Sequence, residues 1–434
     1  MKYYSTNGQA PIADLHKAVV KGLAEDRGLY MPEKIKQLPK AFFDDIEKMS
    51  FQEIAYTVAN AFFGEDVDPD ALHDIVYDTL AFDCPVVEVK DNIYTLELFH
   101  GPTLAFKDVG ARFMARLLQY FIRQENKGEQ VNVLVATSGD TGSAVANGFL
   151  GVDGIHVYVL YPKGKVSPIQ ECQFTTLGKN ITAIEVDGVF DDCQALVKNA
   201  FMDAELNQHM KLTSANSINV ARFLPQAFYY FNAYARMKAL GKAENLVMCV
   251  PSGNFGNICA ALFGHEMGLP VKRFIAANNA NDIFYKYLQT GKYEPKPSKQ
   301  TLANAMDVGD PSNFARIYDL YGKSHERISS LISGATYSDE QIRQTMRQCY
   351  EDTKYILDPH GACGYQALAE GLKPGEVGVF CETAHPAKFK EKVDDILGID
   401  VEIPERLAAF MRGTKQSVPM TKDFADFKRF LLLE

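Results

Sequence analysis

The sequence predicts an α/β fold with parallel sheets, and three observations lead to this prediction. Short apolar strands alternate with helical segments over most of the 434-residue chain. Several of these strands are apolar throughout, which is typical of strands covered on both faces. Two of them run directly into glycine-rich loops that open helices, as parallel sheets require. The length is sufficient for two or three domains.

The predicted strands are β-branched and apolar, and each is followed by a glycine-containing loop or a helical pattern. They are expected at 131–136, 155–162, 180–188, 245–251, 271–278 and 376–384. Because these strands alternate with helices, they are expected to form parallel sheets with helices on both faces. The chain from 84 to 434 is therefore predicted to hold two α/β subdomains, the smaller at roughly 108–215.

Residues 1–83 differ from the rest of the chain in the spacing of their apolar residues and are predicted to form a separate, mostly helical lobe. The runs at 42–63 and 68–80 have helical spacing of apolar residues. Asp68 followed by Pro69 is a typical helix start.

Composition narrows the class of protein and its location. The net charge is −10 and there is no basic run, so neither nucleic acid nor an anionic membrane is expected as a partner. The eight cysteines form no CxxC pair, and the first residues lack the apolar core of a signal peptide. We expect a reduced, cytoplasmic protein without a membrane span.

Two loops share the form S-G-[D/N]-x-G, at 138–142 and 252–256. Glycines let successive backbone N–H groups converge, and the following helix N-terminus adds partial positive charge, so such a loop can bind an anion. For either loop alone, a tight turn that needs glycine remains an equal alternative. The second loop is neutral and suits a phosphate dianion. In the first, Asp140 opposes an anion unless its side chain caps the helix.

Lys107 begins a helical pattern on the side that should face the core. On a helix it is in register with apolar Met114, Leu118 and Phe121, whereas Asp108 belongs to a polar stripe with Arg112. A buried ammonium tends to lose its proton or gain a partner, and neutral lysine is a nucleophile toward carbonyls. The alternative is a lysine that extends past the apolar face or pairs with a neighbouring carboxylate. Asp108 itself is interpreted as an early-turn helix residue.

Further polar residues follow predicted strands. Lys163 follows the strand at 155–162, and Ser214, Asn216 and Arg222 lie in the segment TSANSINVAR. Each group either recognises an anionic substrate or belongs to a solvated loop or helix cap. Thr383 follows the last strand, at the edge where open α/β sheets bind ligands. His385, before a proline, is interpreted as a helix-entry residue.

Well-known motifs of other enzyme classes are missing. The sequence contains no GxxxxGK[ST], GxGxxG, GxSxG or HExxH. An ATPase, a classical dehydrogenase, a serine hydrolase and a zinc protease are therefore not supported, and no metal site is expected.

Several segments together resemble a known family. They are LFHGPTLAFKD around Lys107, TSGDTG, SANSIN, PSGNFG, NAMDV and TAHPAKFKE, in this order along nearly the whole chain. They are similar to the threonine synthase family in its bacterial and fungal class. That family belongs to the tryptophan-synthase-β-like, fold type II enzymes that depend on pyridoxal 5'-phosphate (PLP).

The resemblance implies roles for residues around the two loops. Lys107 would hold PLP covalently and move the substrate's Cα proton, and Thr383 would hydrogen-bond the pyridine nitrogen. The cofactor phosphate would bind Ser252, Gly253, Asn254, Phe255 and Gly256. The substrate's α-carboxylate would bind Thr137, Ser138, Gly139, Asp140 and Thr141. Many fold type II relatives carry Asn where this chain has Asp140, so a contact of this residue with the ring oxygen is in doubt.

The resemblance also implies a reaction, the conversion of O-phospho-L-homoserine and water to threonine and phosphate. Lys163, Ser214, Asn216 and Arg222 are candidates for the pocket of the substrate phosphate. Two alternatives stay open: a PLP lyase that releases 2-oxobutyrate, and a phospho-ligand-binding protein without catalysis. A monomer or a homodimer is expected, with the monomer favoured.

Overall fold

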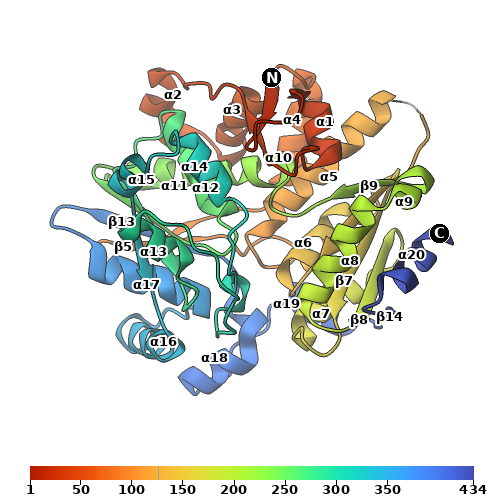
Figure 1. Ribbon diagram of the computed structural model, residues 1–434. Helices are drawn as coiled ribbons and strands as arrows, with labels where there is room; N and C mark the ends of the chain where they lie inside the picture. The colour runs from red at the N-terminus through yellow and green to blue at the C-terminus, as the bar shows by residue number, and fades with distance from the viewer. Residues whose placement is uncertain (126) are drawn as a thin grey trace.

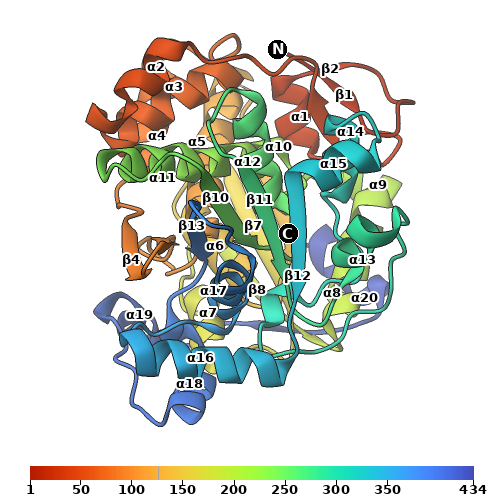
Figure 2. The ribbon, with the colours of Figure 1, turned by 90° about the vertical axis from the view of Figure 1, so that its left-hand side faces the viewer.

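Three sheets organise the molecule, which is described by a computed structural model for residues 1–125 and 127–434. Figure 1 shows an N-terminal lobe above two α/β units, one on the left and one on the right. Figure 2, turned by 90°, shows the N-terminal helices at one end and α16 (Asp339–Thr353) with α18 (Lys390–Leu397) at the opposite end. The fold is therefore α/β, as predicted.

The N-terminal lobe contains helices in both predicted runs; a further helix at Leu15–Lys21 and a small sheet were not expected. Its helices are α1 (Leu15–Lys21), α2 (Lys40–Asp45), α3 (Phe51–Phe63) and α4 (Pro69–Thr79). Asp68 caps α4 and Pro69 opens it, as predicted. The sheet has the order β2-β1-β3 and is antiparallel, with β1 (Lys2–Ser5), β2 (Ala13–Asp14) and β3 (Tyr30–Pro32). Strands of two to four residues are too short to leave a readable alternation.

The left-hand unit is built on a six-stranded sheet of order β12-β11-β10-β13-β5-β4. Its strands are β4 (Val86–Lys90), β5 (Ile93–Glu97), β10 (Leu246–Pro251), β11 (Arg273–Asn278), β12 (Ile332–Thr336) and β13 (Val377–Glu382). All neighbours are parallel except β4, which is antiparallel to β5. The helices associated with it include α11 (Ala227–Ala239), α12 (Gly256–Glu266), α13 (Ile283–Thr290), α14 (Phe314–Leu320), α15 (His325–Leu331) and α17 (Pro359–Gly371).

The right-hand unit is built on a five-stranded, fully parallel sheet of order β14-β8-β7-β6-β9. Its strands are β6 (Val131–Ala136), β7 (Ile155–Pro162), β8 (Ile181–Asp187), β9 (Lys211–Ser214) and β14 (Val418–Thr421). Its helices are α6 (Asp140–Phe149), α7 (Pro168–Thr175), α8 (Phe190–Met202), α9 (Ala204–His209), α19 (Glu405–Met411) and α20 (Phe424–Leu432). The edge strand β14 comes from the C-terminal end of the chain, outside the predicted range 108–215.

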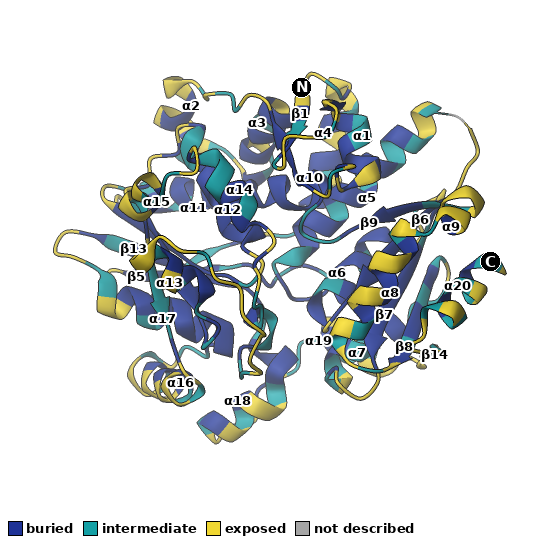
Figure 3. Cartoon of the chain, in the orientation of Figure 1, coloured by how far each residue is buried: buried dark blue, intermediate teal, exposed yellow. Residues whose placement is uncertain are grey.

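The central strands are buried, as their uniformly apolar sequences predicted. Every residue of β6 and of β10 is buried, and Figure 3 shows the central strands as buried, with the exposed residues mainly on outward helix faces and in loops. Strands covered on both faces leave ligands access only at the strand ends. The helix α5 (Lys107–Glu125) packs against both α4 and α6 and so connects the lobe with the right-hand unit. Within the described chain, no helix is long and apolar enough to cross a membrane.

Candidate active site

Both glycine loops connect a buried strand to a helix, as predicted. One runs from β6 to α6 and the other from β10 to α12. In both cases the loop lies at the carboxyl end of a parallel strand, which is the ligand-binding edge of an open α/β sheet.

The neutral loop presents free backbone donors. Among the described residues, none accepts a hydrogen bond from the backbone N–H groups of 253–257. Side chains brace the loop from behind: Ser252 Oγ donates to Asn257 Oδ1 over 3.1 Å, and Asn257 Nδ2 donates to the Pro251 carbonyl over 2.8 Å. A row of unpaired N–H groups at the start of α12 is a preformed anion site.

Close packing explains why a glycine stands at position 253. A Cβ built on Gly253 would lie 2.5 Å from the Ala305 carbonyl oxygen, so no side chain fits there. The strained backbone conformation of this loop is that of Phe255, whose φ of 68° lies in the left-handed region. The Phe255 ring is buried against Phe284, with centroids 4.7 Å apart. Phe255 therefore contributes its backbone to the loop, while its ring belongs to the core.

The loop at 138–142 has a different construction. Thr137 Oγ1 accepts hydrogen bonds from the N–H groups of Gly139 and Gly142, at 2.9 and 2.8 Å. Gly139 has φ of 149°, a conformation that other residues rarely adopt. Ser138 is exposed, whereas Asp140 is buried. The loop's own hydroxyl thus occupies two of its backbone donors.

The Asp140 carboxylate is buried as half of an ion pair. Lys388 Nζ lies 2.5 Å from Asp140 Oδ1, and Gln170 Nε2 donates to the same oxygen over 3.0 Å. Burial alone would raise the pKa of Asp140, but the positive charges of Lys388 and Lys107 outweigh it and lower the pKa to about 2. Asp140 is therefore ionised at neutral pH.

Lys107 is the first residue of α5, and its side chain points at the Asp140 loop. Its Nζ donates to Thr141 Oγ1 over 2.8 Å, and the residue is half-buried. Burial lowers the pKa of Lys107 to about 8; the charge of Asp140 opposes this shift, while Arg222 and Lys388 add to it. With a pKa of about 8, roughly a tenth of Lys107 is neutral, and nucleophilic, at pH 7.

The residues that precede Lys107 tie it to the other sheet. The Phe106 N–H donates to the Thr383 carbonyl over 2.8 Å, and Ala105 forms an isolated bridge with Ala384. Thr383 directly follows β13 and is buried. Since β13 is the parallel neighbour of β10, Thr383 lies on the same sheet edge as the neutral loop. Lys107 thus stands between the edges of the two sheets.

Asp108 lies in the first turn of α5, as expected, but not on a solvated polar face. It is only 2% exposed. Thr103 donates to it twice, from its N–H over 3.0 Å and from its hydroxyl over 2.6 Å. Burial raises the pKa of Asp108 in spite of these bonds. The loop before α5 folds back over the helix start, which helical periodicity cannot indicate.

The candidates for the substrate phosphate are only partly brought together. Ser214 ends β9 and accepts a hydrogen bond from the Asn216 N–H over 3.3 Å. Arg222, in α10 (Val220–Phe223), is buried and donates to the Ala215 carbonyl. Lys163 is exposed at the end of β7, and β6 lies between it and Ser214 in the sheet order.

Several residues of the site were missed from the sequence. Lys388 lies in the short helix η4 (Pro386–Phe389) and is 1% exposed. It also donates to the Thr103 carbonyl over 2.9 Å, and Gln173 donates to that same oxygen over 3.1 Å. The segment TAHPAKFKE was noted, but nothing in it separates a buried Lys388 from the neighbouring Lys390. His385 does cap η4, accepting from the Ala387 N–H over 3.0 Å, so its helix-entry role is confirmed.

In the described part of the chain, no group of three or more His, Cys, Asp and Glu side chains is arranged to hold a metal ion.

Comparison with protein families gives three matches along the chain. The family described as pyridoxal-phosphate dependent enzyme matches residues 77–382. The families described as threonine synthase N terminus and threonine synthase, C-terminal match residues 2–80 and 361–431. Together these three matches cover nearly the whole chain.

Individual proteins are similar over their full length. The chain is 44% identical to threonine synthase from Haemophilus influenzae, with 100% of both chains covered. The crystal structure of threonine synthase from Escherichia coli is similar with a TM-score of 0.93 and 42% identity, again with 100% of both chains covered. A PLP-bound threonine synthase from Brucella melitensis has a TM-score of 0.94 and 34% identity, covering 100% of this chain and 99% of that one. The chain belongs to the threonine synthase family of pyridoxal-phosphate-dependent enzymes.

Proposed function

We propose that the protein forms threonine and phosphate from O-phospho-L-homoserine and water, using PLP held at Lys107. The observation that carries this proposal is the position of Lys107: half-buried, with a lowered pKa, between a loop of free N–H donors and a second polar loop. The full-length similarity to threonine synthases supports the reaction.

The residues present fit PLP. The unpaired N–H groups of 253–257 suit a phosphate, and the Gly253 position leaves no room for a side chain between the loop and Ala305. Thr383, on the same sheet edge, offers a hydroxyl for the pyridine nitrogen. Bound PLP supplies an electron sink for negative charge on the carbon next to the substrate's amine.

In this proposal the chain's own residues orient the substrate and move its protons. The Lys107 amine takes the proton from the substrate's Cα and returns it later, which its lowered pKa favours. Residues 137–141 hold the α-carboxylate, with Thr141 oriented by its bond to Lys107. Ser214, Asn216, Arg222 and Lys163 are assigned to the leaving phosphate; Lys163 is exposed and would reach the site only from the rim. The monomeric state, with a homodimer as the alternative, and the cytoplasmic location stay predictions.

The test is a product assay. Purified protein with PLP and O-phospho-L-homoserine is expected to release phosphate and threonine in equal amounts, measured by a phosphate assay and by chromatography. Formation of 2-oxobutyrate without threonine would contradict the proposal in favour of a lyase.

The role of Lys107 is tested by Lys107→Ala. Turnover is expected to fall at least about 10³-fold, because covalent attachment and proton transfer are both lost. The visible absorbance band that borohydride removes from the unmodified protein is expected to be absent. Lys198→Ala, an exposed lysine on α8, is the matched control and should behave like the unmodified protein. Retained turnover in Lys107→Ala would show that another residue carries the chemistry.

A further inference from the structure

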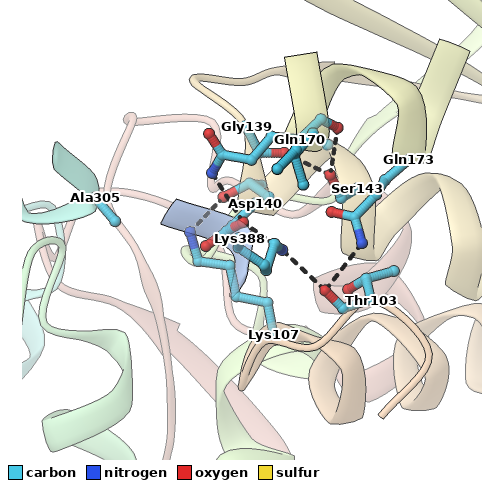
Figure 4. Close-up of polar contacts among 12 residues, drawn as sticks. Thr103, Lys107, Gly139, Asp140, Ser143, Gln170, Gln173, Ala305 and Lys388 are labelled. Atoms are coloured by element: carbon cyan, nitrogen blue, oxygen red, sulfur yellow. Dashed lines mark hydrogen bonds and ion pairs between the residues drawn. The ribbon is translucent and has the colours of Figure 1, made fainter. Parts of the chain in front are cut away.

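A buried ion pair joins the two sheet edges beside Lys107. Lys388 follows β13 of the six-stranded sheet, while Asp140 opens α6 of the five-stranded sheet. Their side chains are 0% and 7% exposed, and the Nζ to Oδ1 distance is 2.5 Å. Figure 4 shows Lys388 extending between Asp140 and the Thr103 carbonyl.

The pair is built into a larger set of bonds. Gln170 donates to the Asp140 oxygen that Lys388 contacts, and Gln173 donates to the Thr103 carbonyl that Lys388 contacts. Both glutamines belong to α7 of the five-stranded unit. A buried charge is costly unless it is paired and hydrogen-bonded, and these partners satisfy that requirement.

The position of the ion pair matters for the reaction, because an unpaired Asp140 carboxylate would act on both the substrate and Lys107. A lone carboxylate at the start of α6 would repel an anionic substrate group. It would also attract the Lys107 ammonium, which donates a hydrogen bond to the neighbouring residue Thr141. Only one carboxylate oxygen, Oδ1, is occupied; among the described residues none donates to Oδ2. Lys388 therefore cancels the charge of Asp140 while the second oxygen stays available as an acceptor.

We propose that Lys388 is a positioning residue for the reaction: it neutralises Asp140 within the substrate-facing loop and ties that loop, through Thr103, to the segment that carries Lys107. This inference rests on the proposed function. Three charged groups from three elements act on Lys107, namely Asp140 from α6, Arg222 from α10 and Lys388 from η4. Removing Lys388 leaves Asp140 to hold Lys107 in its charged form.

The first readout is the reactivity of Lys107 in the full chain freed of PLP. Competitive labelling with acetic anhydride between pH 6 and 10, followed by mass spectrometry of the Lys107 peptide, gives the pH of half-reaction. Lys388→Met is expected to raise this midpoint by about one pH unit or more, because an opposite charge is left uncompensated. Asp140→Asn is expected to lower it, and Asp140→Asn/Lys388→Met to bring it back toward the unmodified value.

The second readout is kinetic. Lys388→Met is expected to lower kcat/KM about 10²-fold through misplacement of the loop, and the double variant to recover part of this loss. Lys390→Met is the matched control: it lies two residues away, is 22% exposed and pairs with Asp394 over 2.8 Å. It should leave the Lys107 midpoint unchanged.

The results that would overturn this inference differ from the results that would overturn the proposed function. A folded Lys388→Met protein with an unchanged Lys107 midpoint would overturn the inference, whatever the product assay shows. If that variant does not fold, the double variant, which buries no unpaired charge, decides: a midpoint far from the unmodified value would equally overturn it. A failed product assay with shifted midpoints would overturn the reaction but not the electrostatic role of Lys388.

Discussion

The two glycine loops are similar in sequence, but they differ in how their backbone N–H groups and their charges are paired. The loop at 252–256 is neutral, is braced by Ser252 and Asn257, and leaves its backbone donors free. The loop at 138–142 uses Thr137 to occupy donors and carries a buried carboxylate that needs Lys388 from the opposite sheet. The same short motif thus forms an anion-binding loop beside one sheet and a contact between the two sheets beside the other.

The glycines differ in the same way. Gly253 is required by close approach of the Ala305 carbonyl, whereas Gly139 is required by its backbone angle and by the proximity of Gln170. A glycine in a motif therefore does not reveal which physical need it serves. Substitutions at these positions can separate the two needs.

The largest effect on stability is expected for Gly139→Ala. The unfavourable φ costs about 1–3 kcal/mol, and the new Cβ, 2.7 Å from Gln170, also displaces the side chain that donates to Asp140. Urea denaturation should show a lower free energy of unfolding. Ser138→Ala, exposed and adjacent, is the control and should stay within about 0.5 kcal/mol. Equal stability of both variants would mean that the loop relaxes freely.

A smaller effect, confined to cofactor binding, is expected for Gly253→Ala. The Cβ would lie 2.5 Å from the Ala305 carbonyl, so the loop has to move by an amount that costs about 1–3 kcal/mol, or about 5- to 150-fold in PLP affinity. Gly256→Ala is the matched control, since its Cβ comes no closer than 3.3 Å to a neighbouring atom, and the nearest backbone atom, the Ser217 carbonyl oxygen, is 3.8 Å away. Titration of the PLP-free protein followed by absorbance measures both. Similar affinities for the two variants would contradict the steric explanation.

The last effect, which depends on pH, concerns a further buried carboxyl, Glu382, at the end of β13. Burial, and after it the charge of the neighbouring Asp358, raises the pKa of Glu382 well above the usual value. Asp358 in turn accepts from His360 Nδ1 over 2.6 Å. Where Asp140 is kept ionised by a lysine, Glu382 is kept protonated by burial and, to a lesser extent, by a neighbouring carboxylate.

The pH dependence follows from this difference. The folded protein holds a proton on Glu382 that the unfolded chain releases above about pH 4.5, so this contribution to stability is lost as pH rises from there toward the folded-state pKa. Glu382→Gln removes the proton exchange and should flatten the fall of Tm between pH 5 and 8. Parallel Tm curves for the two proteins would show that Glu382 does not titrate differently on folding.

Much of the fold was predictable because parallel strands buried on both faces leave long apolar runs, as in β6 and β10. Short strands such as β2 and edge strands such as β14 were missed, because two to four residues carry no clear period. The tertiary contacts, not local propensity, define these strands.

The residues of the candidate site also fall into a group that could be predicted from the sequence and a group that could not. Lys107 and both loops could be identified locally, since a lysine out of register and two glycine motifs are visible in the sequence. Lys388 could not, because its partner Asp140 is distant along the chain and only burial distinguishes it from Lys390. The early-turn position of Asp108 was predicted, but its burial was not, because a loop that folds back onto a helix leaves no periodic signal.

The placement of β14 has a consequence for the order in which the molecule is assembled. β14 pairs with β8 in a parallel register that matches Val418 with Ile184, and Lys415 just before it contacts Glu171 and Glu185. During synthesis, the right-hand sheet therefore keeps an uncovered edge at β8 until residues 418–421 have left the ribosome. Closing that edge is a late, long-range step that requires nearly the whole chain.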